Sequence, residues 1–374
     1  MNILVAAPGY DSRSGREVNV FALDQAKALR DAGHSVRFAA VDTRSVRRFR
    51  PLGFYSYELD GIPVFYGSVP CGRLPLHLPE LAGRTAAGGI YRAATKDGWR
   101  PDIIHQHFGT DFAATAEREN IPLIFTEHAS IHNRLLSSAE AAQLKKNYGQ
   151  CAAVLAVSRA LAENMRRNTG VEAKVLPNIV DTSVFSGKRL PHDGFSFVTA
   201  GNLIPVKNMA MLLRSFAHVS GEVTLTVFGD GEERRSLEEL CAALGIENRV
   251  TFRGHCPREQ LAEAYASADC FVLASQSETF GVAYIEAMAA GLPVIATRCG
   301  GPEDFVTEEN GILIPTDDEA ALTDAMESMI LHRNGYDSAA ISAAARKNFA
   351  PEEIARRLTE VYSRVLNRAA SERK

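Results

Sequence analysis

Two glutamates eight positions apart could bind an extended polar ligand. Glu278 and Glu286 enclose residues 279–285, and the second glutamate falls inside a predicted helix that ends before Gly291. A helix rises about 1.5 Å per residue, so the two carboxylates cannot share one metal ion or form a tight acid/base pair. They suit a ligand with hydroxyl groups at two separate places. Two surface glutamates that flank the start of a helix would give the same spacing.

The residues between the two glutamates could bind phosphate. Thr279, Phe280 and Gly281 lie at the predicted start of the helix, where amides lack intrahelical acceptors and the helix dipole favours an anion. The order of carboxylate, phosphate-binding amides and carboxylate matches the sugar hydroxyls, diphosphate and ribose hydroxyls of a nucleotide sugar. The pattern therefore favours a nucleotide-sugar site.

Short apolar strands alternate with helices along the chain, in two blocks. Residues 3–7 and 34–41 are predicted strands that enclose a helix, and the alternation restarts after the Gly/Pro/charge-rich residues 186–194. Such βαβ units build doubly wound parallel sheets, which bind ligands at the carboxyl ends of their strands. We therefore expect an α/β protein with two Rossmann-like domains, residues 1–185 and 186–350, that face each other across a deep cleft.

Composition excludes several other classes of protein. The 374 residues are 46% hydrophobic and 23% charged, with a net charge of −4, which is an ordinary globular mixture. No apolar run reaches the roughly 18 residues of a membrane-spanning helix, and residues 1–8 do not resemble a secretory signal. The six cysteines include no Cys-x-x-Cys pair, so a zinc site gets no support. We expect a cytoplasmic protein that does not bind nucleic acid.

The stretch around Glu278 and Glu286 resembles the Glu-x7-Glu motif of glycosyltransferase family four, which has the GT-B fold. Segments that resemble other motifs of this family follow in the family's order, at residues 29–36, 101–105, 126–128, 176–181, 201–208, 228–232, 253–255, 268–275 and 299–303. The resemblance covers nearly the whole chain.

The resemblance implies an enzyme, a retaining glycosyltransferase of the kind found in polysaccharide biosynthesis of the cell envelope. It would move a hexose or N-acetylhexosamine from a UDP- or GDP-linked donor to a lipid-linked, glycan or small-molecule acceptor. It also implies that no metal or other cofactor is needed. Residues 351–366 have an amphipathic pattern, and in this fold such a final helix crosses back to the N-terminal domain, so residues 351–374 form a third segment. Its polar tail from residue 367 is expected to fray.

The same resemblance suggests roles for individual residues. Glu286 would hold the ribose hydroxyls, Glu278 would contact the transferred sugar, and Lys207 would stabilise the negative charge of the leaving diphosphate. His128 would contact donor sugar and acceptor, since an imidazole can donate or accept near neutral pH. A solvated lysine and a buried structural histidine are the alternatives for Lys207 and His128. Further expected donor contacts are Ser14, Gly15, Gly201, Asn202, Gly254 and His255.

Asn202 stands where the family usually carries an arginine. Asparagine can donate a hydrogen bond but brings no charge. A substitute cation could come from Arg13, Arg16 or Arg298.

Two groups of residues could contact the acceptor. His105 and His107 lie at the end of a predicted strand, where acceptor contact and a structural role are both open, and no Cys or carboxylate is spaced to complete a metal site. A basic cluster with interleaved aromatic residues suits an anionic lipid surface or a phosphorylated acceptor, or is simply a solvated loop. Membrane attachment through it would be weak and peripheral, on the inner face. The cluster comprises Arg44, Arg47, Arg48 and Arg50.

Three other functions share this architecture. A nucleotide-sugar epimerase would need acid/base carboxylates around the sugar, and the separation of Glu278 and Glu286 argues against it. An NAD-dependent oxidoreductase would need Gly-x-Gly-x-x-Gly, but residues 229–234 end in arginine. A non-catalytic sugar-binding protein is the third.

Overall fold

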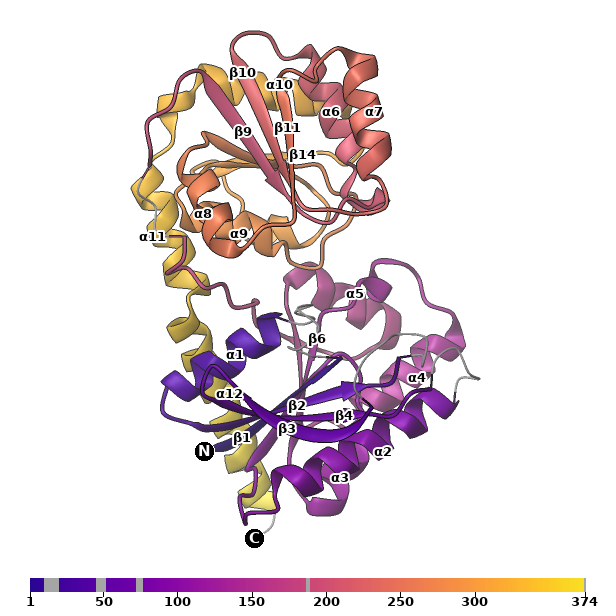
Figure 1. Cartoon of the computed structure of the whole chain (residues 1–374). Helices are drawn as coiled ribbons and strands as arrows, with labels where there is room; N and C mark the ends of the chain where they lie inside the picture. Colours follow the sequence, from indigo (N-terminus) through magenta and orange to yellow (C-terminus); the bar gives the residue numbers. More distant parts are fainter. Residues whose placement is uncertain (10–19, 45–51, 72–76, 186–188, 373–374) are drawn as a thin grey trace. The chain divides into compact units, whose positions relative to one another are not determined.

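The computed structural model describes residues 1–9, 20–44, 52–71, 77–185 and 189–372. The chain forms two compact units (Figure 1). The first combines Met1–Val157 and Leu161–Ile179 with Pro351–Lys374, and the second combines Ser158–Ala160 with Val180–Ala350. Strands and helices alternate in both units, which confirms the predicted α/β class. Within the described ranges, every helix is too short or too polar to span a lipid bilayer.

The first unit is built on a mostly parallel sheet, whose described strands follow the order β3-β4-β2-β1-β5-β6-β7-β8. Only β3 and β4 pair antiparallel, as an edge hairpin that the sequence did not predict. The chain enters the sheet at β1, builds to one side, and returns to β5 on the other. The carboxyl ends of β1 and β5 therefore mark the switch point of the sheet. The strands are β1 Asn2–Pro8, β2 Ser35–Asp42, β3 Gly53–Leu59, β4 Ile62–Ser68, β5 Ile103–His107, β6 Leu123–Glu127, β7 Ala153–Ala156 and β8 Lys174–Val175.

Helices connect these strands. Three of them, α2, α3 and α4, were not predicted from the sequence. Helix α4 begins with a capping box, in which Ser137 accepts from the amide of Glu140 and the Glu140 side chain accepts from the amide of Ser137. The helices are α1 Val20–Asp31, α2 His77–Ala94, α3 Ala113–Glu119, α4 Ser138–Tyr148 and α5 Arg159–Thr169, whose residues from Leu161 onward belong to this unit.

The last helix, α12 (Pro351–Glu372), packs against α1 in the first unit (Figure 1). Its apolar face is buried in the core, where Leu358 and Tyr362 are fully inaccessible to solvent. The Tyr362 hydroxyl lies 2.7 Å from Nδ1 of His105 on β5. Val365 and Leu366 pack against the core, and α12 continues through the polar tail as far as Glu372.

Replacing Leu358 by alanine should destabilise the first unit by about 2–5 kcal/mol, because it removes a fully buried side chain and leaves a cavity. Urea unfolding would measure the loss. The exposed Ser363 lies on the same helix, and Ser363→Ala should change the stability by less than about 0.5 kcal/mol. The pocket described below should be unaffected by Leu358→Ala, since it lies in the second unit. Equal effects of the two substitutions would contradict the placement of α12 in this core.

The second unit contains a parallel sheet, whose described strands follow the order β11-β10-β9-β12-β13-β14. The chain enters at β9, builds through β10 and β11, and returns to β12, so β9 and β12 enclose the switch point. Bounds of the strands are β9 Phe195–Ala200, β10 Val223–Phe228, β11 Val250–Gly254, β12 Cys270–Leu273, β13 Val294–Thr297 and β14 Gly311–Ile314. Bounds of the helices are α6 Met209–His218, α7 Arg234–Leu244, α8 Arg258–Ala266, α9 Val282–Ala289, α10 Glu319–Leu331 and α11 Ser338–Phe349.

The division between the units falls at Ile179, earlier than the expected boundary at residue 185. The amide of Val180 donates to the carbonyl of Phe349 at 3.0 Å, and Arg346 donates to the carbonyl of Phe185. These bonds to α11, a helix that the sequence did not predict, hold residues 180–185 in the second unit.

Candidate functional site

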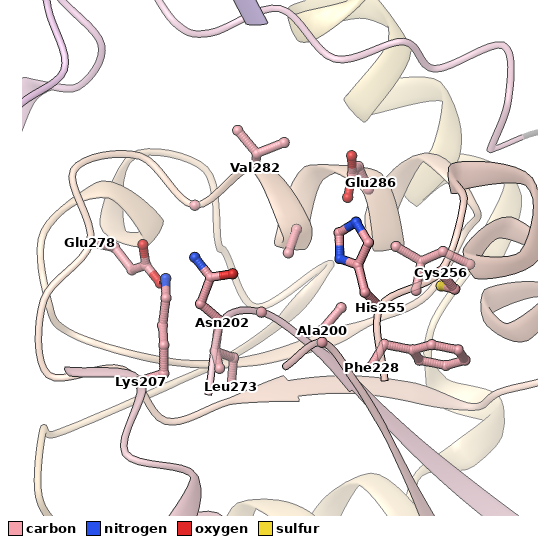
Figure 2. Close-up of a pocket in the computed structure, with 15 residues that line it drawn as sticks. Ala200, Asn202, Lys207, Phe228, His255, Cys256, Leu273, Glu278, Val282 and Glu286 are labelled. Carbon is pink, nitrogen blue, oxygen red and sulfur yellow. The ribbon is translucent and has the colours of Figure 1, made fainter. Parts of the chain in front are cut away.

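A cavity of about 350 Å³ lies at the carboxyl ends of β9, β10 and β12, at the switch point of the second sheet (Figure 2). Its volume falls within the roughly 300–1,000 Å³ of small-molecule sites. The structure brings together seven of the residues predicted for the donor site along its walls: Gly201, Asn202, Lys207, His255, Glu278, Gly281 and Glu286.

Bare backbone forms the floor of the pocket. Gly229, after β10, has φ +114°, and a Cβ atom there would lie 1.9 Å from the carbonyl oxygen of Gly201. Its amide donates to the carbonyl of Gly254 at 2.8 Å. Only glycine permits this positive φ and this close approach. The backbone at Gly201 and Gly229 can therefore approach a ligand closely, whereas Gly254, a predicted donor contact, is not among the lining residues.

Helix α9 begins at the pocket wall. Its N-cap, Gly281, has φ +101°, and the first helical residues, Val282 and Ala283, line the cavity. Amides in the first turn of a helix have no intrahelical acceptor, and the helix dipole favours an anion there. Thr279 and Phe280 are not among the lining residues, and the Phe280 ring is buried instead among other aromatic rings. The anion-binding capacity at this point therefore comes from backbone.

The two predicted glutamates occupy different parts of the pocket (Figure 2). Glu278 forms an ion pair with Lys207, with 2.5 Å between Oε1 and Nζ, and the same oxygen accepts a 2.8 Å hydrogen bond from Ser275 Oγ. Glu286, on α9, has Nε of Arg258 at 3.8 Å from its Oε1. The sequence analysis included Ser275 in one of the matching segments but gave no role in the site to Ser275 or Arg258. The Ser-x-x-Glu spacing could have indicated the first, but no local signal marks Arg258.

Lys207 is the only lysine or arginine among the described residues that line this cavity. Of the three arginines considered as substitutes for the missing charge at Asn202, Arg298 lies outside the lining, 4.0 Å from Glu303. Arg13 and Arg16 lie outside the described residues, as do Ser14 and Gly15. Within the described pocket, positive charge thus comes from one ammonium group and the start of α9.

A buried histidine pair lies in the first unit. Nδ1 of His107 and Nε2 of His128 are 2.8 Å apart, and the rings of Phe21 and Phe108 pack at 4.6 and 4.8 Å from the His128 ring. Burial lowers the pKa of His107 to about 3. Burial, followed by the effect of His107, lowers the pKa of His128 well below its ordinary value. Both rings are therefore neutral near pH 7, where they can act as hydrogen-bonding groups but not as cationic acids.

His105 differs from this pair because both of its ring nitrogens have partners. Nδ1 lies 2.7 Å from the Tyr362 hydroxyl and Nε2 lies 2.7 Å from Thr126 Oγ1. This arrangement favours the structural role for His105. Among the described residues, no group of three or more His, Cys, Asp or Glu side chains could hold a metal ion.

The neutral histidines make the stability of the first unit pH-dependent. The unfolded chain takes up a proton at His107 below about pH 6.5, whereas the folded chain does so only near pH 3. The free energy of unfolding should therefore fall as pH drops through this window, by about 2 kcal/mol for His107 alone between about pH 6.5 and pH 5. Urea unfolding at several pH values measures the slope. His107→Gln should flatten it and the exposed His332→Gln should not; identical slopes would refute the linkage.

One arginine of the basic cluster is described, and it has a buried partner. Arg44 donates to both carboxylate oxygens of Asp42, at 2.9 and 2.7 Å, and Asp42 also accepts from the Tyr66 hydroxyl. Burial alone would raise the pKa of Asp42, but these hydrogen bonds outweigh it and lower that pKa. Arg44 therefore anchors the end of β2. Arg47, Arg48 and Arg50 lie outside the described residues.

Comparison with known proteins defines the class. Residues 18–184 match the family described as Glycosyltransferase Family 4, and residues 182–348 match the family described as Glycosyl transferases group 1. The chain is 30% identical over 291 residues to the "Putative teichuronic acid biosynthesis glycosyltransferase TuaC" of Bacillus subtilis, covering 72% of each chain. It is 28% identical to a D-inositol 3-phosphate glycosyltransferase of Xylanimonas cellulosilytica, covering 96% of this chain and 94% of that protein.

Solved structures share the fold. Sucrose-phosphate synthase from Thermosynechococcus elongatus superposes with a TM-score of 0.79 at 20% identity, covering 97% of this chain and 99% of that one. HepE of Anabaena, solved in complex with UDP, superposes with a TM-score of 0.76 at 21% identity, covering 97% and 100%. The chain belongs to glycosyltransferase family 4. It is a GT-B enzyme with two Rossmann-like domains, and it transfers a sugar from a nucleotide sugar.

Proposed function

We propose that this enzyme transfers a hexose or N-acetylhexosamine from a UDP-sugar, with retention of anomeric configuration. The observation that carries the proposal is the arrangement of the pocket in the second unit. Lys207 and Glu278 stand together in one part, the start of α9 follows, and Glu286 stands in another part. Relatives in the same fold support UDP as the nucleotide, since HepE of Anabaena was solved with UDP and with UDP-glucose.

Each part of the pocket suits one part of the donor. The ammonium of Lys207 and the first amides of α9 would bind the diphosphate, Glu286 would accept hydrogen bonds from the ribose hydroxyls, and Glu278 would accept them from the sugar. Asn202, His255 and the backbone at Gly201, Gly229 and Gly254 would complete the contacts. Charge develops on the diphosphate as the glycosidic bond breaks, so a fixed cation there stabilises the transition state more than the ground state.

Retention does not need an enzyme nucleophile in this scheme. With the donor bound, the Glu278 carboxylate would accept hydrogen bonds from Ser275 Oγ and from the sugar hydroxyls, which makes it a poor candidate for attack on the sugar. The departing phosphate oxygen would instead accept the proton of the acceptor hydroxyl on the face from which it leaves. The first unit would contribute His128, whose Nδ1 is buried and has no hydrogen-bond partner among the described residues, as a neutral contact for sugar or acceptor. No metal is needed for these steps.

Binding of nucleotide sugars tests the donor. A thermal-shift screen with UDP-, GDP- and ADP-sugars should show the largest stabilisation with a UDP-sugar, since a ligand that binds only the folded state raises its stability. Release of free UDP should then require an acceptor. An epimerase would instead convert the nucleotide sugar without any acceptor. A response to none of these compounds at millimolar concentration would reject the proposal, and a strongest response to a GDP- or ADP-sugar would correct the nucleotide.

The acceptor is proposed to be a polyhydroxylated compound of cell-envelope biosynthesis. D-inositol 3-phosphate and a precursor of teichuronic acid are the first candidates to test, given the names of the relatives. Arg47, Arg48 and Arg50 would favour a phosphorylated acceptor or an anionic membrane surface. Sedimentation with vesicles that contain anionic lipid, compared with neutral vesicles, would separate membrane attachment from binding of a soluble acceptor.

A further inference from the structure

The cation and the carboxylate that would serve different parts of the donor form an ion pair with each other. Nζ of Lys207 lies 2.5 Å from Oε1 of Glu278, and the two side chains are 20% and 10% exposed (Figure 2). A diphosphate that binds to Lys207 must compete with this carboxylate. The free energy needed to separate such an ion pair depends on which groups then replace the lost partner of each charge.

Glu278 is held more firmly than Lys207. Its amide donates to the carbonyl of Cys299 at 3.0 Å, its carbonyl accepts from the amide of Gly301 at 2.9 Å, and its carboxylate accepts from Ser275. Ser275 is itself fully buried. Lys207, by contrast, carries its charge on a flexible four-carbon stem. When a diphosphate binds, the ammonium can turn toward it, whereas the carboxylate stays in place.

A nucleoside diphosphate without a sugar would therefore leave Glu278 in an unfavourable state. The carboxylate would lose its cation, remain mostly buried, and lie near the negative charge of the phosphates. A sugar attached to the diphosphate changes this balance, because its hydroxyl groups can donate to the same carboxylate and replace the lost partner.

We propose that Ser275, Glu278 and Lys207 together make the pocket discriminate a nucleotide sugar from the bare nucleoside diphosphate that remains after transfer. The inference rests on the proposed function, because it takes Lys207 as the diphosphate contact and Glu278 as the sugar contact. Once the sugar has moved to the acceptor, Glu278 loses its donors and again competes for Lys207. The contact between Lys207 and Glu278 that favours the nucleotide sugar thus lowers the affinity for the product, the nucleoside diphosphate.

Calorimetric titration of UDP and of the best-binding UDP-sugar tests the inference. Glu278→Gln keeps the size of the side chain and removes its charge. This variant should bind UDP more tightly and the UDP-sugar more weakly than the wild type, so that the ratio of the two dissociation constants changes by at least about tenfold. Product inhibition by UDP should become stronger in the same proportion.

Glu278→Asp separates the effect of the negative charge from the effect of contact with the sugar. It retains the negative charge on a shorter side chain, so affinity for UDP should stay within about threefold of wild type while affinity for the UDP-sugar falls. Equal changes for both ligands in Glu278→Gln, or tighter binding of UDP by Glu278→Asp, would overturn the discrimination. Failure of the wild type to bind either compound would instead overturn the proposed donor, and the inference with it.

Discussion

Replacing Lys207 by methionine is expected to lower kcat by about 10²–10³-fold, which is the usual cost of removing one preorganised group that stabilises transition-state charge. Methionine keeps a long, flexible side chain but removes the ammonium, the only Lys or Arg side-chain charge in the described pocket lining. Asn202 supplies no second charge, so no other lysine or arginine of that lining can compensate. Acceptor-dependent release of UDP under steady-state conditions measures the effect.

Two variants control this experiment. Lys347 is an exposed lysine of α11 in the same unit, and Lys347→Met should leave kcat unchanged. Lys207→Arg keeps the charge on a bulkier, planar group and should lose less activity than Lys207→Met. A kcat for Lys207→Met within about threefold of wild type would show that the lysine does not stabilise the leaving group.

Replacing Glu286 by glutamine is expected to weaken binding of UDP by about 10–100-fold, because hydrogen bonds to a charged acceptor contribute about 1.5–3 kcal/mol. The carboxylate is largely buried and lines the pocket from the second turn of α9. Isothermal titration of wild type and variant with UDP and with 2′,3′-dideoxyuridine diphosphate measures the effect. If Glu286 holds the ribose, the wild type should bind the dideoxy compound more weakly than UDP. Glu286→Gln should bind the two compounds with similar affinity.

This double comparison distinguishes a contact between Glu286 and the ribose from an effect of the substitution on the stability of α9. Glu259 is an exposed carboxylate on the neighbouring helix α8, and Glu259→Gln should bind both nucleotides as the wild type does. The assignment of Glu286 to the ribose would be wrong if Glu286→Gln lost affinity equally for both compounds, since the two losses would then be independent of the hydroxyls.

Most residues predicted to contact the donor in the second unit lie together in one pocket, whereas several of those predicted in the first unit fall outside the described residues. Between Gly201 and Glu286, the predicted residues follow strand ends of one parallel sheet, and parallel strands bring their carboxyl ends to one edge. In the first unit, the expected contacts at Ser14, Gly15 and three arginines fall on residues that the structure does not describe. The hairpin β3–β4 and helices α2, α3, α4 and α11 were missed.

By itself, the sequence determined the alternation of strands and helices, the two-domain α/β class and the spacing of Glu278 and Glu286, because these depend on the order of neighbouring residues. Only the tertiary structure decided that Lys207 pairs with Glu278, that His107 pairs with His128, and that Tyr362 of α12 meets His105. Each of these contacts joins residues far apart in the chain. Which distant side chains meet, and how much water they lose, depends on packing that no local pattern specifies.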